Sequence, residues 1–95
     1  MKALKVKVEN FIVELAKKYN LSKAILYGSR ARGDNHERSD IDLAVEGGDV
    51  VNFILELDEE APTLLMFDVV NLADNLSEDF LAEIERDGVI LYEKI

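Results

Sequence analysis

The chain contains no cysteine, and His36 is the single histidine among its 95 residues. Disulfides and thiolate metal sites are therefore excluded, and one imidazole is too few for the usual zinc site. Serine nucleophile chemistry lacks a well-placed base, because His36 lies in the same polar stretch as Ser29. Oxygen-rich ligation without histidine or cysteine suits Mg²⁺ or Mn²⁺.

Long apolar runs are also missing, and lysines interrupt the apolar residues near the N-terminus. This pattern is neither that of a signal peptide nor that of a membrane span, so we expect a cytoplasmic protein with no membrane association. Basic residues are scarce: 11 Lys and Arg stand against 20 Asp and Glu, for a net charge of −9. Direct nucleic-acid binding is therefore disfavoured. The acidity favours a basic partner, although solubility alone also explains it.

The composition, with 48% hydrophobic and 33% charged residues, is that of a globular protein. We expect a single domain over residues 1–95, without internal repeats or linkers. A chain of this length builds only a small core, which leaves room for a partner surface to add stability.

Apolar residues spaced three and four apart predict a helix over residues 3–19, with Asn20 as its stop. A short buried strand is predicted over Lys23–Tyr27. Residues 28–39 show no apolar periodicity and predict a loop with at most one helical turn. Ser39–Glu46 alternates, which predicts a strand with Ile41, Leu43 and Val45 on one face and Asp40, Asp42 and Ala44 on the other.

In the second half, Asp49 is predicted to cap a helix that runs to about Glu60 before Pro62. Its expected apolar face comprises Val50, Val51, Ile54, Leu55 and Leu57, with Phe53 beside them. The segment Leu64–Leu72 is nearly all apolar, which predicts a central strand covered on both faces.

Ser77 is predicted to cap a last helix, packed through Phe80, Leu81 and Ile84. Gly88 fits the C′ position, and an edge strand or extended tail follows over 89–92. The expected fold class is α/β (α+β), with helices packed on a mixed β-sheet of three to four strands.

Three aspartates are candidate metal ligands. Asp40 and Asp42 lie two apart on a predicted strand, so both point to one face, roughly 6–7 Å apart at the backbone. Two such carboxylates repel unless a cation lies between them or one is protonated. Asp68 lies within an apolar strand, where a buried carboxylate needs a partner. If the two strands are neighbours, the three carboxylates could hold two metal ions about 3.5–4 Å apart.

The turn before these aspartates is a candidate phosphate site. Gly28 permits close backbone approach, and Ser29 offers a hydroxyl and an amide. Arg30 and Arg32 offer guanidinium forks suited to phosphate oxygens. An acidic metal site beside a basic anion site is suited to a metal-bound nucleoside triphosphate.

Each feature alone has a structural explanation. Gly28-Ser29 could be a simple turn, and Asp40 with Asp42 a solvated strand face. Asp68 could end a strand or form a salt bridge, and Tyr27 is expected to pack rather than to catalyse. The two arginines could neutralise Asp34 and Glu37. The conjunction and spacing of the features favour a functional site.

Gly28-Ser29, ten residues and then Asp40-x-Asp42 resembles the signature of the DNA polymerase β-like nucleotidyltransferase superfamily. The flanking segments, residues 26–33 and 39–45, are similar to those of the minimal nucleotidyltransferase (MNT) group, whose members commonly act as antitoxins beside HEPN-domain ribonuclease toxins. The resemblance covers essentially the whole chain and implies a small nucleotidyltransferase fold.

The resemblance also implies roles. Gly28 and Ser29 would hold the β- and γ-phosphates of ATP, and Arg30 and Arg32 would assist. Two Mg²⁺ ions would be bound by Asp40, Asp42 and Asp68, and Asp68 would also help to deprotonate the acceptor hydroxyl.

The implied function is that of an antitoxin: transfer of AMP from ATP to a hydroxyl, typically of tyrosine, on a HEPN toxin, with release of pyrophosphate. Larger relatives carry an acceptor-binding domain that this chain lacks, so we expect a partner to present the acceptor. Two alternatives remain open: an antitoxin that blocks its toxin sterically without catalysis, and a nucleotidyltransferase that acts on a small-molecule hydroxyl.

Overall fold

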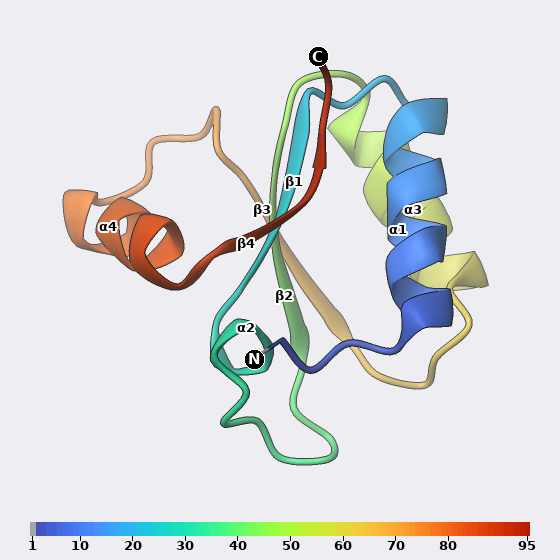
Figure 1. The fold of residues 1–95 in the computed structure, drawn as a ribbon. Helices are drawn as coiled ribbons and strands as arrows, with labels where there is room; N and C mark the ends of the chain where they lie inside the picture. The colour runs from blue at the N-terminus through green and yellow to red at the C-terminus, as the bar shows by residue number, and fades with distance from the viewer. Residues whose placement is uncertain (1) are drawn as a thin grey trace.

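The computed structural model describes residues 2–95 (Figure 1). Helices and strands follow one another in the order α1 (Val6–Lys18), β1 (Lys23–Tyr27), α2 (Ser29–Arg32), β2 (Ile41–Glu46), α3 (Val50–Glu60), β3 (Phe67–Asn71), α4 (Glu78–Asp87) and β4 (Val89–Glu93). None of the helices in this described part is long and apolar enough to cross a membrane.

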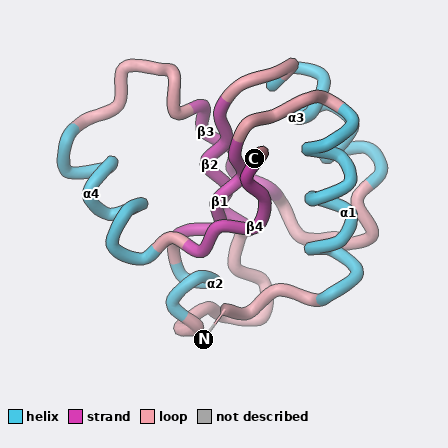
Figure 2. Tube along the Cα trace, turned by 45° about the horizontal axis from the view of Figure 1, so that its top comes forward, coloured by secondary structure: helices cyan, strands magenta, loops and turns pink. Residues whose placement is uncertain are grey.

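The strands form one mixed sheet in the order β3-β2-β1-β4. β1 pairs antiparallel with β2 and β4, whereas β2 and β3 are parallel. A parallel pair needs a crossover, which α3 supplies. Helices α1 and α3 cover one face of the sheet and α4 lies on the other, as Figure 2 shows. The expected mixed sheet with helices packed on it is confirmed.

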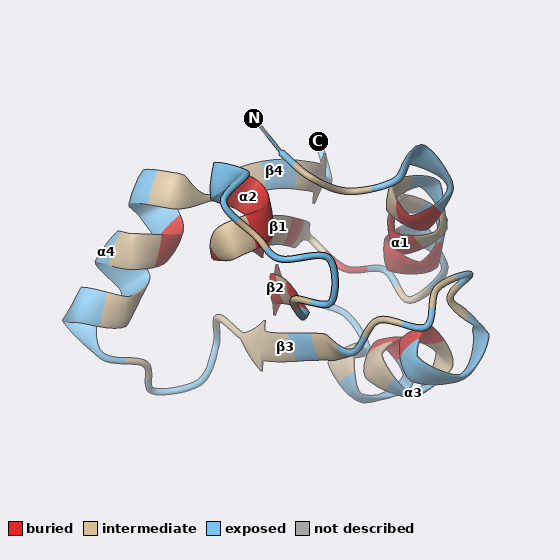
Figure 3. Cartoon of the chain, turned by 90° about the horizontal axis from the view of Figure 1, so that it is seen from below, coloured by how far each residue is buried: buried red, intermediate tan, exposed pale blue. Residues whose placement is uncertain are grey.

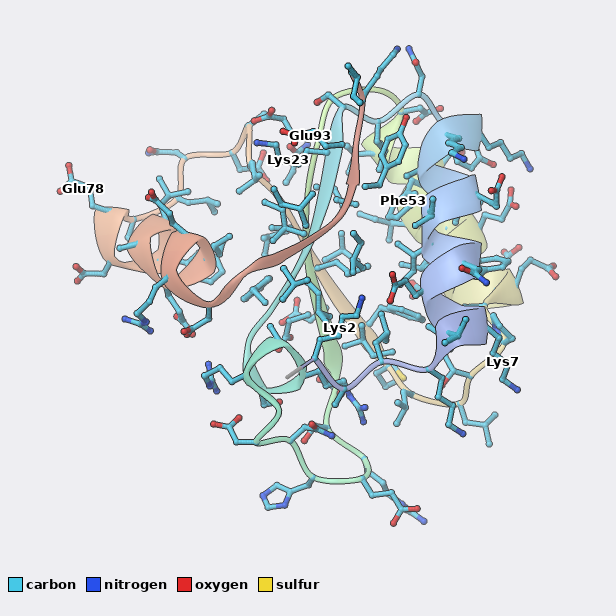
Figure 4. All side chains as sticks on the ribbon, in the orientation of Figure 1. Lys2, Lys7, Lys23, Phe53, Glu78 and Glu93 are labelled. Carbon is cyan, nitrogen blue, oxygen red and sulfur yellow. The ribbon has the colours of Figure 1, made fainter. Side chains whose placement is uncertain are left out.

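The main core lies between the sheet and the pair α1 and α3, the side on which Figure 4 labels Phe53. Ile41, Leu43 and Val45 of β2 point into it and are fully buried. The other face of the sheet carries only a small buried cluster, formed by Tyr27, Ala44 and Ile84. The predicted alternation of β2 is therefore confirmed, and its aspartate face lies on the thinly covered side.

Two predicted helices differ in detail from the observed ones. α1 begins at Val6 rather than at residue 3, although Leu4 still packs against the core. In α3, Phe53 and Leu57 are buried, but Val51 and Leu55 are 69% and 54% exposed. The apolar arc of α3 is wider than the surface beneath it, so the expectation that all its apolar residues pack was wrong.

The segment 64–72 is not a central strand. Only Phe67–Asn71 is extended, and β3 lies at an edge of the sheet with β2 as its one partner. Phe67 and Val69 pack on the main core while Val70 and Leu72 pack on the α4 side, so both faces are partly covered. An apolar run in the sequence indicates that both faces of a strand are covered, but it does not indicate whether the strand has one neighbouring strand or two.

The predicted caps are confirmed. The Asp49 carboxylate accepts from the Asn52 amide at 3.2 Å, and the Ser77 hydroxyl accepts from the Phe80 amide at 3.1 Å. Gly88 does end α4, but its backbone is extended, with φ −67° and ψ 142°, rather than left-handed. A Cβ there would overlap the Ile84 carbonyl oxygen, so close packing and not backbone conformation requires this glycine.

Candidate active site

The phosphate turn and the aspartate strand meet at Gly28. In the β1–β2 ladder Tyr27 lies opposite Asp42, which puts Gly28 beside the Asp42 side chain. The φ of Gly28 is +73°, a region that favours glycine. A Cβ at this position would overlap Oδ2 of Asp42. The two halves of the motif are thus in direct contact, and only glycine fits between them.

The three aspartates gather where β2 and β3 run side by side. Asp42 and Asp68 are paired in the parallel register, and Asp40 directly precedes β2. Burial, and then the charges of Asp68, Asp40 and Glu83, raise the pKa of Asp42. The structure therefore pairs Asp42 with Asp68, and the charges of Asp40 and of Glu83 of α4 lie close enough to act on Asp42.

Asp68 is exposed, contrary to the expectation that its carboxylate is buried. The cause is the position of β3 at the sheet edge, where α4 leaves this end of the strand uncovered. Figure 3 shows the contrast between the buried β2 and the more exposed β3. An exposed carboxylate needs no ion pair, so Asp68 stays available to a ligand.

Tyr27 forms the apolar base of this site. Its ring contacts Phe80 edge-on, with centroids 5.6 Å apart. Burial, followed by the charges of Asp42, Asp68 and Glu83, raises the pKa of the Tyr27 hydroxyl to about 12. Tyr27 therefore stays neutral at physiological pH and packs, as expected.

The side chains of residues 2–95 are not arranged as a group of three or more acids or histidines that could hold a metal ion. Their chemistry nevertheless fits Mg²⁺, since the donors are all carboxylate oxygens. Burial, and then repulsion from neighbouring acids, raises the pKa of Asp42, and a bound cation would relieve the repulsion. Asp40 and Asp68 are exposed, which leaves their side chains free to turn toward an ion.

Arg30 has a different environment from the one expected of a phosphate ligand. It is buried, with 8% exposure. Its guanidinium donates to the carbonyl oxygens of Ser39 (2.9 Å), Glu37 (3.0 Å), Ala3 (3.2 Å) and His36 (3.5 Å). These bonds tie the loop that leads to Asp40 to the N-terminal segment, which favours a structural role.

Arg32 is exposed and forms ion pairs. Its Nε is 3.1 Å from a carboxylate oxygen of Asp34, so the structural alternative, that Arg32 neutralises Asp34, is what the structure shows. Its Nη1 is 3.4 Å from Asp87 at the end of α4. The Arg32 side chain is 38% exposed, whereas that of Asp87 is 14% exposed and is also paired with Arg86.

Sequence reasoning missed Glu83 and Asp87. Both lie on the face of α4 that carries Phe80 and Ile84, at spacings of three and four residues. That spacing was the available signal, because acids in register with an apolar helix face are directed toward the sheet. Only the position of α4 in space brings them to Asp42 and Arg32.

A glycine turn in contact with one acid of a strand pair, and a further acid on the adjacent parallel strand, define a site suited to a metal-bound nucleoside triphosphate. The family model described as polymerase beta, nucleotidyltransferase, matches residues 10–95. The chain therefore belongs to this family and is a nucleotidyltransferase domain.

Individual relatives agree. The chain is 34% identical over 96 aligned positions to a putative protein adenylyltransferase of Methanocaldococcus jannaschii, covering 90% of this chain and 94% of the relative. Among solved structures, it matches a chain of a toxin–antitoxin complex crystallised with AMP-PNP, with a TM-score of 0.71, 29% identity and coverage of 90% of this chain and 73% of that one.

The same fold recurs at lower identity. A chain of the complex between the MNT antitoxin and the tri-AMPylated HEPN toxin of Shewanella oneidensis gives a TM-score of 0.63 at 24% identity, with coverage of 92% and 71%.

Proposed function

We propose that this chain is an antitoxin that transfers AMP from ATP to a hydroxyl, most simply a tyrosine hydroxyl, of a partner HEPN toxin. The observation that carries the proposal is the contact between Gly28 and Asp42 beside the Asp42–Asp68 register. Support comes from the relative named as a protein adenylyltransferase and from the structural neighbour crystallised as a toxin–antitoxin complex with an ATP analogue. In this proposal residues 1–95 form one minimal catalytic domain, and the protein acts in the cytoplasm.

In this proposal Asp40, Asp42 and Asp68 hold Mg²⁺, with two ions as the expected number. Bound there, the metal would neutralise triphosphate charge and polarise the phosphoryl oxygens. Gly28 and Ser29 receive the β- and γ-phosphates, and Arg32 exchanges its carboxylate partners for phosphate oxygens. Arg30 shapes the loop behind them.

The chemical step joins the acceptor oxygen to the α-phosphorus of ATP. The bond from that phosphorus to the oxygen that bridges it to the β-phosphorus breaks, and pyrophosphate leaves with this electron pair. Asp68, the exposed carboxylate, takes the hydroxyl proton. Tyr27 keeps its own proton and excludes water beneath Asp42.

The test incubates this purified chain with a candidate HEPN partner, ATP and Mg²⁺, and then measures the intact mass of both proteins. We expect the HEPN protein to gain the mass of one or more AMP groups, and Asp42→Asn to abolish the gain. An unchanged mass, with Asp42→Asn still neutralising the toxin in cells, would instead establish the steric antitoxin. That alternative draws support from the apolar side chains exposed on this small chain.

A further inference from the structure

A groove of about 870 Å³ opens between the start of α1, the loop before β2 and the segment that leads into β3. It lies on the main-core side of the sheet, because its wall includes Ile41, which points into that core. Asp42 and its paired residue Asp68, by contrast, lie on the opposite face of the sheet, the side on which α4 lies. The proposed nucleotide site does not use this groove.

The groove presents apolar side chains to solvent. Leu64 is fully exposed and Met66 is 70% exposed, whereas Leu65 between them packs against the core. Single exposed apolar residues are common on any protein surface. Two such residues in one groove of a small domain are typical of an interaction site, where methionine is enriched.

The cations around this groove differ from the others in the chain. Lys5, Lys7 and Arg38 line it, and Figure 4 labels Lys7 near the start of α1. The side chains of the other cations of residues 2–95 all have partners: six form ion pairs with acids, Lys94 bonds to the Asn20 side chain and Arg30 bonds to backbone carbonyls. Within that described range, neither a salt bridge nor a side-chain hydrogen bond engages these three. In a chain of net charge −9, the cations without a partner therefore gather at one groove.

This charge pattern selects the occupant. Of the side chains that line the groove, Glu37 is the one acid, so an anionic ligand is favoured. Single-stranded nucleic acid would need stacking platforms, and the lining includes no aromatic residue. A polypeptide segment with apolar side chains and flanking acids satisfies both the exposed Leu64 and Met66 and the unpaired cations.

The groove also lies next to the proposed site along the backbone. Ile41 lines it and directly follows Asp40, while Met66 lines it and precedes Asp68 by two residues. The Ile41 amide donates to the Met66 carbonyl at 2.9 Å, which joins the two segments rigidly. A segment held in the groove is thus held at a fixed position relative to Asp40 and Asp68.

We propose that this groove docks an apolar, acid-flanked segment of the acceptor protein and so positions that protein's hydroxyl at the carboxylates. The inference rests on the proposed function, since it assumes a protein acceptor. It assigns recognition to Leu64, Met66, Lys5, Lys7 and Arg38, and leaves nucleotide binding to the turn.

Two double variants test it against a matched control. Leu64→Ser with Met66→Ser removes the apolar contact, and Lys5→Glu with Lys7→Glu reverses the charge. All four side chains are exposed, so the fold should tolerate the changes. Val51→Ser with Leu55→Ser removes an exposed apolar pair of similar size from α3.

The readouts are the Kd for the HEPN protein by titration calorimetry and the Kd for ATP with Mg²⁺. We expect each groove variant to weaken protein binding about ten-fold or more, equivalent to about 1.4 kcal/mol. ATP binding should be unchanged, and the α3 control should bind both ligands normally. Added salt should weaken the wild-type complex and have less effect on the charge-reversed one.

Wild-type protein binding in the groove variants, equal loss in the α3 control, or no complex with the wild-type chain would overturn the proposal. So would a wild-type dimer that the groove variants convert to monomer, because the occupant would then be a second copy. Binding of a single-stranded oligonucleotide that the lysine variants abolish would overturn it too. Loss of transfer with an intact, groove-dependent complex would refute the proposed chemistry alone.

Discussion

At the residue scale, Gly28 has two separate reasons to be glycine. Its φ of +73° disfavours any side chain, and a Cβ would also meet the Asp42 carboxylate. The first cost is local to the backbone, at about 1–3 kcal/mol. The second displaces Asp42 and therefore bears on function.

We expect Gly28→Ala to lower the free energy of unfolding by more than that backbone cost and to abolish nucleotide transfer. Gly33→Ala is the matched control, because Gly33 has a φ of +88° and is exposed. Urea unfolding of both variants, with and without Asp42→Ala, measures the contact. If Asp42→Ala does not partly rescue the stability of Gly28→Ala, the overlap is not the cause.

The raised pKa of Asp42 predicts a pH dependence of stability. Asp42 binds its proton more tightly in the native state than in the unfolded chain, where the pKa of an aspartate has its ordinary value of 3.8. Raising the pH from about 4 through the native pKa therefore removes the stability that protonated Asp42 contributes to the wild type. Asp42→Asn cannot titrate, so its stability relative to the wild type should increase over that window.

Urea unfolding between pH 3.5 and 7.5 in EDTA checks this, with Asp58→Asn on α3 as a control for charge removal alone. Saturating Mg²⁺ should narrow the difference between the wild type and Asp42→Asn at neutral pH. A stability difference that is constant with pH would contradict a raised pKa of Asp42 in the native state.

The sequence pointed to the glycine turn and the three aspartates, but not to the contacts that α4 makes with them. Gly28 and Asp42 lie in one short motif, so spacing sufficed to relate them. The partner of Arg32 on α4 lies 55 residues away, and no local pattern records that pairing. The four carbonyls bound by Arg30 could not be predicted either, because every residue type has a backbone carbonyl and the sequence does not show which of them will accept a hydrogen bond.

At the scale of elements, the caps of α3 and α4 offer a comparison. Asp49 and Ser77 each accept one amide hydrogen bond at the start of their helix. Replacing either cap with alanine should cost about 1 kcal/mol of stability. Of these two helices, only α4 contacts the site: Phe80 packs against Tyr27, and Asp87 pairs with Arg32.

We therefore expect Ser77→Ala and Asp49→Ala to lower the melting temperature similarly, while only Ser77→Ala raises the KM for ATP. Thermal unfolding and steady-state kinetics measure the two effects. Equal kinetic effects of the two variants would show that α4 does not support the site.

Element types were predicted well, and their edges poorly. The periodicity of α1 and the alternation of β2 reflect one-sided burial, which sequence records directly. The run 64–72 failed because apolar character marks both buried strands and exposed interaction surfaces. Leu64 and Met66 are apolar without being core, so the strand was predicted to be too long and too central.

At the scale of the whole molecule, the net charge of −9 acts against the compact state. Like charges repel over the screening distance, which falls from about 30 Å at 0.01 M salt to about 8 Å at 0.15 M. Most ion pairs here involve at least one exposed side chain, so they contribute little to stability. Screening these pairs with salt should therefore cost the folded state little.

We expect sodium chloride to raise the melting temperature by a few degrees between 0.01 and 0.3 M at pH 7.5. For a domain of this size, 1 kcal/mol corresponds to about 4–8 °C. The same titration near the pI of about 4.5 should show no rise, because the net charge vanishes there. A fall in melting temperature at neutral pH would show that attractive pairs dominate.

The bonds of Arg30 have a consequence for how this protein can change over evolution. They fix the loop through the carbonyls of His36, Glu37 and Ser39, and carbonyls are common to all residue types. Apart from Ser39, whose hydroxyl accepts a hydrogen bond from the His36 amide at 2.8 Å, the side chains of that loop are thus under little constraint from the fold. Arg38, at the groove, can be exchanged for another residue while the path of the backbone stays the same. Such a loop lets the surface of the groove vary between related proteins while Asp40 and Asp42, the proposed metal ligands, remain in place.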